Sequence, residues 1–357
     1  MTALDGIKVE HGLSDYLRHG ISLWDLVDKD SISSVTILLT YACPAACDHC
    51  VFESSPSRRE TVNPETARRF VMAAARQDPP PSLSFSGGEA FLQLDLMREL
   101  TDLAASLGMA SEVISSSGWA TSDERATRVL RDLYARGMRT YCTSIDDLHA
   151  AFIDPRKMRR AVEAALGEGY TVVINSIIRS DTRGRETEHI SKITGLPMET
   201  LGRCVVHPFI TVPVGRARTN VNDYLYLNKD FQEGCPFSTE IVTLSPRGFT
   251  YPCCGMVIGE PTSRAGLFIQ DNLDGKSVDE IAEVIEALKN DLFFKLLQTM
   301  GPYRLLQEIK KANPELDARD RFTGSCDVCL EFTANPAIAE ATRRFLDKCQ
   351  AALYPVT

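Results

Sequence analysis

The chain has 357 residues, of which 44% are hydrophobic and 24% are charged, and its formal net charge is -9 at pH 7. This composition is ordinary for a globular protein, and the length suffices for one large domain and a smaller one. The acidic balance argues against nucleic acid as the main partner, because phosphate binding needs a basic surface.

The sequence contains no signal for export or membrane insertion. Its first ten residues carry charges where a signal peptide needs an apolar run, and no stretch approaches the apolar length that spans a bilayer. We therefore expect a cytoplasmic protein without a membrane partner. Cytosolic thiols stay reduced, so clusters among the 11 cysteines indicate metal ligation rather than disulfides.

Short apolar runs alternate with amphipathic stretches between residues 34 and 218. The predicted strands are 34–40, 82–86, 111–115, 140–145, 170–178 and 205–214. The predicted helices are 64–76, 94–107, 124–136 and 155–168, and later 277–288, 291–311 and 336–353. This alternation predicts an α/β fold with a parallel sheet. Six strands are too few for an eight-stranded barrel, so we expect a partial (β/α)6 TIM-like barrel.

Three cysteines follow the first predicted strand: Cys43, Cys47 and Cys50, with the spacing Cys-x3-Cys-x2-Cys. Three thiolates can hold three irons of a [4Fe–4S] cube and leave the fourth iron open to bind a small molecule. Alternatively, His49 supplies a fourth ligand and the motif binds structural zinc. The spacing by itself leaves both alternatives open.

Further polar motifs follow the next predicted strands. Gly87-Gly88-Glu89 comes after the second strand, residues 115–118 (Ser-Ser-Ser-Gly) after the third, and residues 144–147 (Ser-Ile-Asp-Asp) lie at the fourth. Parallel α/β folds gather their chemistry at the carboxyl ends of the strands. We therefore expect these motifs and the cysteines to form one site.

In this order, the motifs resemble the radical S-adenosylmethionine superfamily over residues 34–218. Residues 212–217 (Val-Pro-Val-Gly-Arg-Ala) are also similar to a sixth-strand ending of that superfamily. The resemblance implies that the three cysteines bind a [4Fe–4S] cluster whose open iron binds S-adenosylmethionine. Reductive cleavage of this cofactor then yields a 5′-deoxyadenosyl radical, which abstracts a hydrogen atom from the substrate. A metal-binding protein without catalysis would leave Gly87-Gly88-Glu89 unexplained.

The resemblance also assigns residues to the cofactor: His49, Gly87, Gly88, Glu89, Ser144, Arg156 and Asn175. Glu89 and the two glycines are expected at the methionyl ammonium, where glycine permits close approach of the backbone. Ser144 and Arg156 are expected at the methionyl carboxylate, and Asn175 near the ribose. His49 stands where the family usually has an aromatic residue near adenine, and its ring can still stack.

Four more cysteines, Cys235, Cys253, Cys326 and Cys329, resemble the shortened auxiliary domain known as a twitch domain, a relative of the SPASM domain. The resemblance implies one auxiliary [4Fe–4S] cluster, with four-thiolate zinc as the alternative. Cys254 competes with Cys253 as the ligand. The expected organisation is an N-terminal cap (1–33), the radical domain (34–218), the auxiliary domain (219–335) and a C-terminal helix (336–357).

Candidates for substrate chemistry lie around the fourth predicted strand. Cys142 and Ser144 share one strand face, so Cys142 points inward and either donates hydrogen to a substrate radical or packs in the core. Asp146, Asp147 and His149 are candidates for proton transfer, and the alternative for His149 is a place at a helix start or in the core. Other polar side chains near strand ends, either substrate-binding or structural, are His207, Arg179 and Arg216.

We therefore expect a radical enzyme of oxidoreductase type that acts on a small polar biosynthetic intermediate by oxidation, epimerisation or rearrangement. The auxiliary cluster would accept the resulting electron, and a flavodoxin or ferredoxin would supply the reducing electron. The alternative is a maturase that modifies a ribosomally synthesised precursor peptide.

Overall fold

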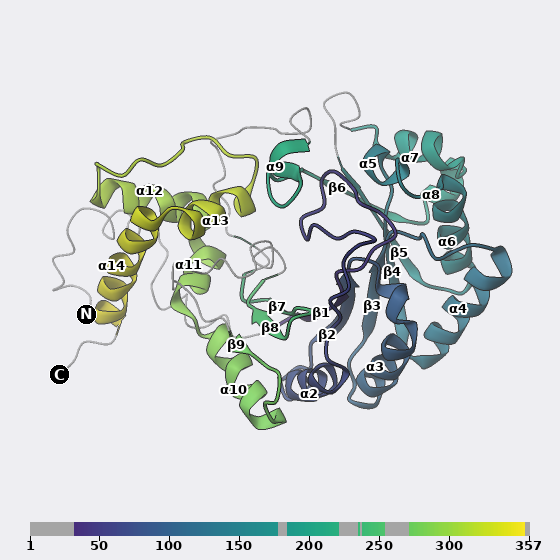
Figure 1. Ribbon diagram of the computed structural model, residues 1–357, viewed down its shortest axis with the longest axis horizontal. Coiled ribbons are helices and arrows are strands. Elements are labelled where there is room, and N and C mark those ends of the chain that lie inside the picture. The colour runs from purple at the N-terminus through teal and green to yellow at the C-terminus, as the bar shows by residue number, and fades with distance from the viewer. Residues whose placement is uncertain (1–31, 178–183, 221–234, 236–237, 254–270, 354–357) are drawn as a thin grey trace.

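The computed structural model describes residues 32–177, 184–220, 235, 238–253 and 271–353, and Figure 1 shows how their helices and strands are arranged. The predicted cap lies almost entirely outside these ranges, as do Arg179 and Cys254. Within the ranges, no helix is long and apolar enough to cross a membrane.

The described strands form one sheet in the order β6-β5-β4-β3-β2-β1-β7-β8-β9. They are β1 (Ser34–Thr40), β2 (Ser82–Gly87), β3 (Ser111–Ser115), β4 (Met138–Ser144), β5 (Thr171–Ile177), β6 (Val205–Phe209), β7 (Ile241–Leu244), β8 (Phe249–Tyr251) and β9 (Asp271–Asn272). Strands β1 to β6 are parallel neighbours in chain order, and β7 joins β1 in parallel. Strands β8 and β9 are antiparallel. The predicted α/β fold with a parallel central sheet is confirmed.

Helices connect the parallel strands and continue beyond them. They are α2 (Pro64–Ala74), the 3-10 helix η2 (Ala90–Gln93), α3 (Leu94–Ser106), α4 (Asp123–Arg136), α5 (Asp147–Ala150), α6 (Pro155–Gly167), α7 (Glu186–Thr194), α8 (Met198–Leu201), α9 (Ala217–Asn220), α10 (Val278–Lys289), α11 (Leu292–Met300), α12 (Pro302–Ala312), α13 (Ser325–Ala334) and α14 (Pro336–Leu353). The predicted helix 291–311 is two helices, because Gly301 has a φ of 81° and Pro302 begins a new first turn.

Local sequence sets where the main helices begin. The Asn63 side chain accepts the backbone N–H of Glu65, and Pro64 occupies the first turn of α2. Ser277 and Glu280 form a capping box at α10. These caps satisfy backbone groups that helix ends otherwise leave without partners.

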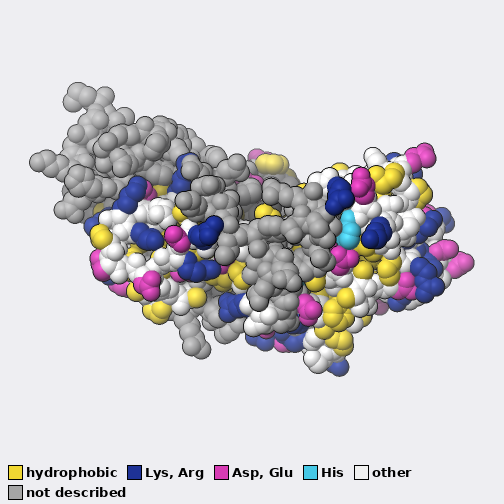
Figure 2. Space-filling view, turned by 90° about the horizontal axis from the view of Figure 1, so that it is seen from above, with side chains coloured by type: hydrophobic (Ala, Val, Ile, Leu, Met, Phe, Trp, Pro, Cys, Tyr) yellow, Lys and Arg dark blue, Asp and Glu magenta, His cyan; other side chains and the backbone are white. Residues whose placement is uncertain are grey.

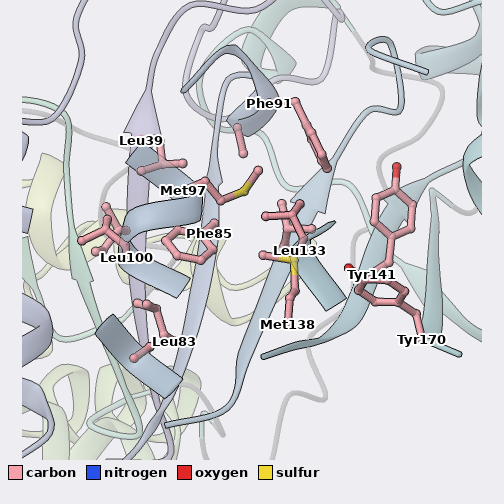
Figure 3. Packing of buried hydrophobic residues seen from close by; sticks show 14 of the residues in the cluster. Leu39, Leu83, Phe85, Phe91, Met97, Leu100, Leu133, Met138, Tyr141 and Tyr170 are labelled. Carbon is pink, nitrogen blue, oxygen red and sulfur yellow. The ribbon is translucent and has the colours of Figure 1, made fainter. Parts of the chain in front are cut away.

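One face of the sheet is apolar and packs against helices, which lie outside the sheet in Figure 1. Leu83 and Phe85 of β2 lie in the same buried cluster as Met97 and Leu100 of α3 (Figure 3). Side chains alternate along a strand, so the residues between them point to the opposite face, which we call the inner face. A register slip of one residue would bring the inner-face Ser84 into the apolar core, so the pattern specifies the register.

Helices α11 to α14 build a second core at the other end of the molecule, around residues such as Phe293 and Phe332. Cys349 is buried in this core, as expected for a cysteine outside the motifs. Helix α10 belongs to the first core, because Ile281 and Ile285 are in the cluster under the sheet. The segment predicted as one auxiliary domain therefore contributes to both cores.

Charged side chains pair across neighbouring helices at the surface. Arg98 of α3 lies 2.6 Å from Asp132 of α4, and Arg131 of α4 lies 2.9 Å from Glu168 after α6. Each such exposed pair contributes at most about 1 kcal/mol. On the face seen in Figure 2, the basic and acidic side chains of the described residues are interspersed.

Candidate functional site

The cysteine loop, residues 41–50, follows β1 and carries three thiols close enough to interact. Cys43 and Cys47 are 8% and 7% exposed, and Cys50 is part-buried. Burial raises the pKa of Cys47 to about 12, and the nearby Cys50 and Cys43 contribute by their charge. The pKa of Cys43 is also raised to about 12, chiefly by burial. Such thiols become thiolates when a metal binds them, so the set suits a metal cluster.

Gly87 and Gly88 bring the end of β2 against the cysteine loop. The Gly88 N–H donates to the Thr40 carbonyl (2.6 Å), and a Cβ on Gly88 would lie 2.2 Å from the Ala42 carbonyl oxygen. Gly87 has a φ of 126°, which favours glycine. The sequence predicted that these glycines admit a ligand. In the structure they admit the backbone of the cysteine loop itself.

Arg216 ties the segment after β6 to the same loop. Its Nε donates to the Cys47 carbonyl (2.9 Å), and its guanidinium also donates to the Ser54 carbonyl (2.7 Å). Gly215 permits this contact, because a Cβ there would lie 2.5 Å from the Cys50 carbonyl oxygen. Sequence reasoning offered Arg216 as a substrate or structural charge, and its contacts are structural.

Glu89 is buried behind the loop and 1% exposed. Its carboxylate accepts from Ser115 Oγ (2.8 Å), from the Ser116 N–H (3.1 Å) and from the Phe91 N–H (3.2 Å). Burial raises the pKa of Glu89, against the lowering effect of the Ser116 and Ser115 bonds. Both oxygens therefore have partners within the protein, whereas the sequence-based hypothesis directs them to a cofactor ammonium. The serines at positions 115 to 117, at the end of β3, are the sequence signal from which these hydrogen bonds to Glu89 could have been predicted.

Two histidines and an aspartate lie beside the cysteine loop. The His49 and His149 rings meet edge to face with centroids 4.5 Å apart, and His149 Nδ1 is 2.9 Å from Asp146 Oδ1. Burial opposes ionisation of Asp146, but His149 outweighs it and holds the pKa of Asp146 at about 2. Burial and then His149 lower the pKa of His49 to about 3, so its ring is neutral at pH 7. Asp146 therefore stays ionised and orients His149.

The remaining predicted residues divide between the inner face and the surface. Ser144 and Asn175 are register partners on β4 and β5, and Asn175 Nδ2 donates to Cys142 Sγ (3.0 Å). Burial raises the pKa of Cys142 to about 12, so its thiol is protonated. Arg156 is not brought into this group: its side chain is 85% exposed and bound to Asp154.

The structure also brings most of the second cysteine set together. Cys329 lies on α13, where burial and the charges of Cys235 and Cys326 raise the pKa of Cys329 well above its usual value. Cys253 is buried directly after β8, and the adjacent Pro252 carbonyl accepts the Thr239 N–H. The Cys235 N–H in turn donates to the Leu297 carbonyl within α11.

Among the residues that the structure describes, no group of three or more His, Cys, Asp or Glu side chains is placed to hold a metal ion.

Comparisons with known proteins identify relatives of the segment that contains the cysteine loop. Residues 37–192 match the family model described as "Radical SAM superfamily". Over 307 residues the chain is 26% identical to the "Putative peptide biosynthesis protein YydG" of Bacillus subtilis (strain 168), covering 83% of this chain and 90% of that protein.

Two solved structures are similar at lower sequence identity. The structure of anSMEcpe with bound AdoMet and the Cp18Cys peptide has a TM-score of 0.48 at 13% identity, covering 87% of this chain and 99% of that one. The structure of BtrN in complex with AdoMet and 2-DOIA has a TM-score of 0.47 at 12% identity, covering 76% and 89%.

Proposed function

We propose that the chain is a radical S-adenosylmethionine enzyme that modifies a precursor peptide, and that residues 37–192, which match the radical SAM family model, form its radical SAM domain. The observation that carries the proposal is the convergence of three thiols at the end of β1 within that domain. The similarity to YydG, a peptide biosynthesis protein by its name, favours a peptide over the small polar intermediate that we first expected.

The cysteine loop fits a [4Fe–4S] cluster held by Cys43, Cys47 and Cys50, because their thiols are grouped and largely buried. The bound cluster and S-adenosylmethionine would supply reductive cleavage of the sulfonium and, with it, hydrogen abstraction from the substrate. Arg216 and the Gly87-Gly88 turn hold the loop in the required shape. A fixed loop matters because small displacements of reacting groups cost large factors in rate.

The inner face supplies the substrate side of the site. Ser144 ends β4 and is the register partner of Asn175 on β5, and this pairing supports a shared role at the cofactor. Cys142 holds a protonated thiol, the form needed to give a hydrogen atom to a carbon radical. Asp146 fixes His149 against the neutral His49 ring, which is the assigned partner of adenine.

Cys235, Cys253, Cys326 and Cys329 would hold one auxiliary [4Fe–4S] cluster. The mutual influence of Cys329, Cys235 and Cys326 supports this assignment. Four thiolates satisfy all four irons, so this cluster would pass electrons rather than bind substrate. A flavodoxin or ferredoxin would reduce the first cluster.

Anaerobic reconstitution tests the proposal. We expect about eight irons per chain, one [4Fe–4S] cluster from each cysteine set, and 5′-deoxyadenosine after reduction in the presence of S-adenosylmethionine. A variant with Cys43, Cys47 and Cys50 replaced by alanine should keep about four irons per chain and should form no 5′-deoxyadenosine. A peptide encoded beside the gene should change in mass on incubation with the reduced enzyme in D2O, because cross-linking or oxidation removes hydrogen and epimerisation through the Cys142 thiol introduces deuterium. Zinc binding without cofactor cleavage would refute the radical activity, and an unaltered peptide would refute the substrate class.

A further inference from the structure

Below the cofactor residues, the inner face carries a continuous row of polar side chains. Strand register aligns them from β7 to β4, and we call them the Glu112 layer: Thr243, Thr36, Ser84, Glu112 and Thr140. Barrels of this kind usually fill their interior with branched aliphatic side chains. A row of hydroxyls around a carboxylate is instead suited to a polar ligand.

Two hydroxyls of this layer are buried without hydrogen-bond partners in the described structure. They are Ser84 Oγ and Thr243 Oγ1, and their residues are 2% and 0% exposed. Buried polar groups in proteins almost always have a partner, and those without one call for an explanation. Ser84 is the register neighbour of Glu112, so the hydroxyl without a partner belongs to the residue next to Glu112 on the adjoining strand.

Glu112 itself is part-buried, and in the described ranges its carboxylate makes no hydrogen bond or ion pair. Its charge acts on Cys142, one position nearer the cysteine loop on the same face. Arg139 on β4 does not neutralise it, because that guanidinium donates to the Tyr134 carbonyl (2.7 Å) and stacks on the Tyr134 ring. A part-buried carboxylate without a cation suits a ligand that brings one.

We propose that the Glu112 layer binds a lysine or arginine side chain of the peptide substrate, with Glu112 as its counter-ion. This inference rests on the proposed peptide substrate and names its chemical class. Ser84 and Thr140 flank Glu112 in register on the neighbouring strands, so their hydroxyls can accept the remaining N–H groups of an ammonium or guanidinium. A peptide anchored there passes Cys142 on its way to the cysteine loop.

Binding without turnover tests this inference. The probes are two capped heptapeptides, three alanines on either side of lysine in one and of norleucine in the other. We expect the reconstituted holoprotein to bind the lysine peptide at least about tenfold more tightly, as one charge-assisted pair provides. Isothermal titration calorimetry without reductant measures both affinities. Because no cofactor is cleaved, failure of the radical activity leaves this result intact.

Variants attribute the preference to the carboxylate. Glu112→Gln and Glu112→Thr should bind both peptides equally, whereas Glu112→Asp should retain a preference for lysine. Glu283→Gln, the matched change at an exposed position on α10, should keep the full preference. Equal affinity of the wild-type protein for both peptides, including no binding of either, overturns the proposal. So does a preference that survives both Glu112→Gln and Glu112→Thr.

Discussion

The contact of Arg216 with the cysteine loop predicts how tightly the first cluster is held. Arg216→Met keeps the aliphatic stem but removes two charged hydrogen bonds, to the Cys47 and Ser54 carbonyls. Hydrogen bonds to a charged group contribute roughly 1.5 kcal/mol each at the low end, so the folded loop loses about 3 kcal/mol. This loss favours loop opening by roughly 100-fold. Cluster loss should accelerate by a similar factor.

The assay is iron release from the reconstituted holoprotein to an excess chelator, followed by visible absorbance. In Arg216→Met, about four of the about eight irons should leave in a fast phase, while the auxiliary cluster keeps its wild-type rate. Arg216→Lys should be intermediate, since lysine reaches one carbonyl. The control is Arg218→Met, two residues later and exposed. If the Arg216→Met protein released iron no faster than the Arg218→Met protein, Arg216 would not hold the cysteine loop around the cluster.

Three further predictions concern the loop packing, the buried aspartate and the second cysteine set. Gly88→Ala places a Cβ 2.2 Å from a backbone oxygen of the cysteine loop, so the variant should bind about four irons fewer than the wild-type protein. The control is Gly167→Ala, where the added Cβ meets open space, and it should bind the full number of irons. Asp146 has its pKa lowered to about 2, so its carboxylate stabilises the fold above pH 4 and stops doing so as the pH falls toward 2. Urea unfolding should therefore show that Asp146→Asn lowers the free energy of unfolding by about 2 kcal/mol at pH 7 and by less below pH 4. An equal loss at pH 7 and below pH 4 would contradict the stabilisation of the Asp146 carboxylate by His149. Cys329→Ser should lower the iron content from about eight to about four while 5′-deoxyadenosine still forms, and unchanged iron would remove Cys329 from the ligand set.

Local patterns in the sequence were sufficient for much of the fold. Alternation of apolar runs with amphipathic stretches predicted β1 to β6, six of the seven parallel strands that the structure describes, because burial on both faces and helix crossovers leave a periodic signal. Strands β7, β8 and β9 escaped prediction, since they are only four, three and two residues long and β7 and β8 occur where Gly, Pro and Cys are frequent. The break between α11 and α12 is readable from Gly301-Pro302, but the helical periodicity on either side concealed it.

The sequence by itself determined that Cys43, Cys47 and Cys50 lie in one loop, because their spacing is local and needs no contact between distant segments. Tertiary structure alone decided which residues hold the cysteine loop in place, since Arg216 binds the Cys47 carbonyl from 169 positions away in the chain. It also decided that Glu89 is enclosed by hydrogen bonds and that Glu112 lies on the inner face. Contacts between distant segments depend on which strands pair and which face meets the helices. Those choices minimise the free energy of the whole chain and leave no signature at any single position.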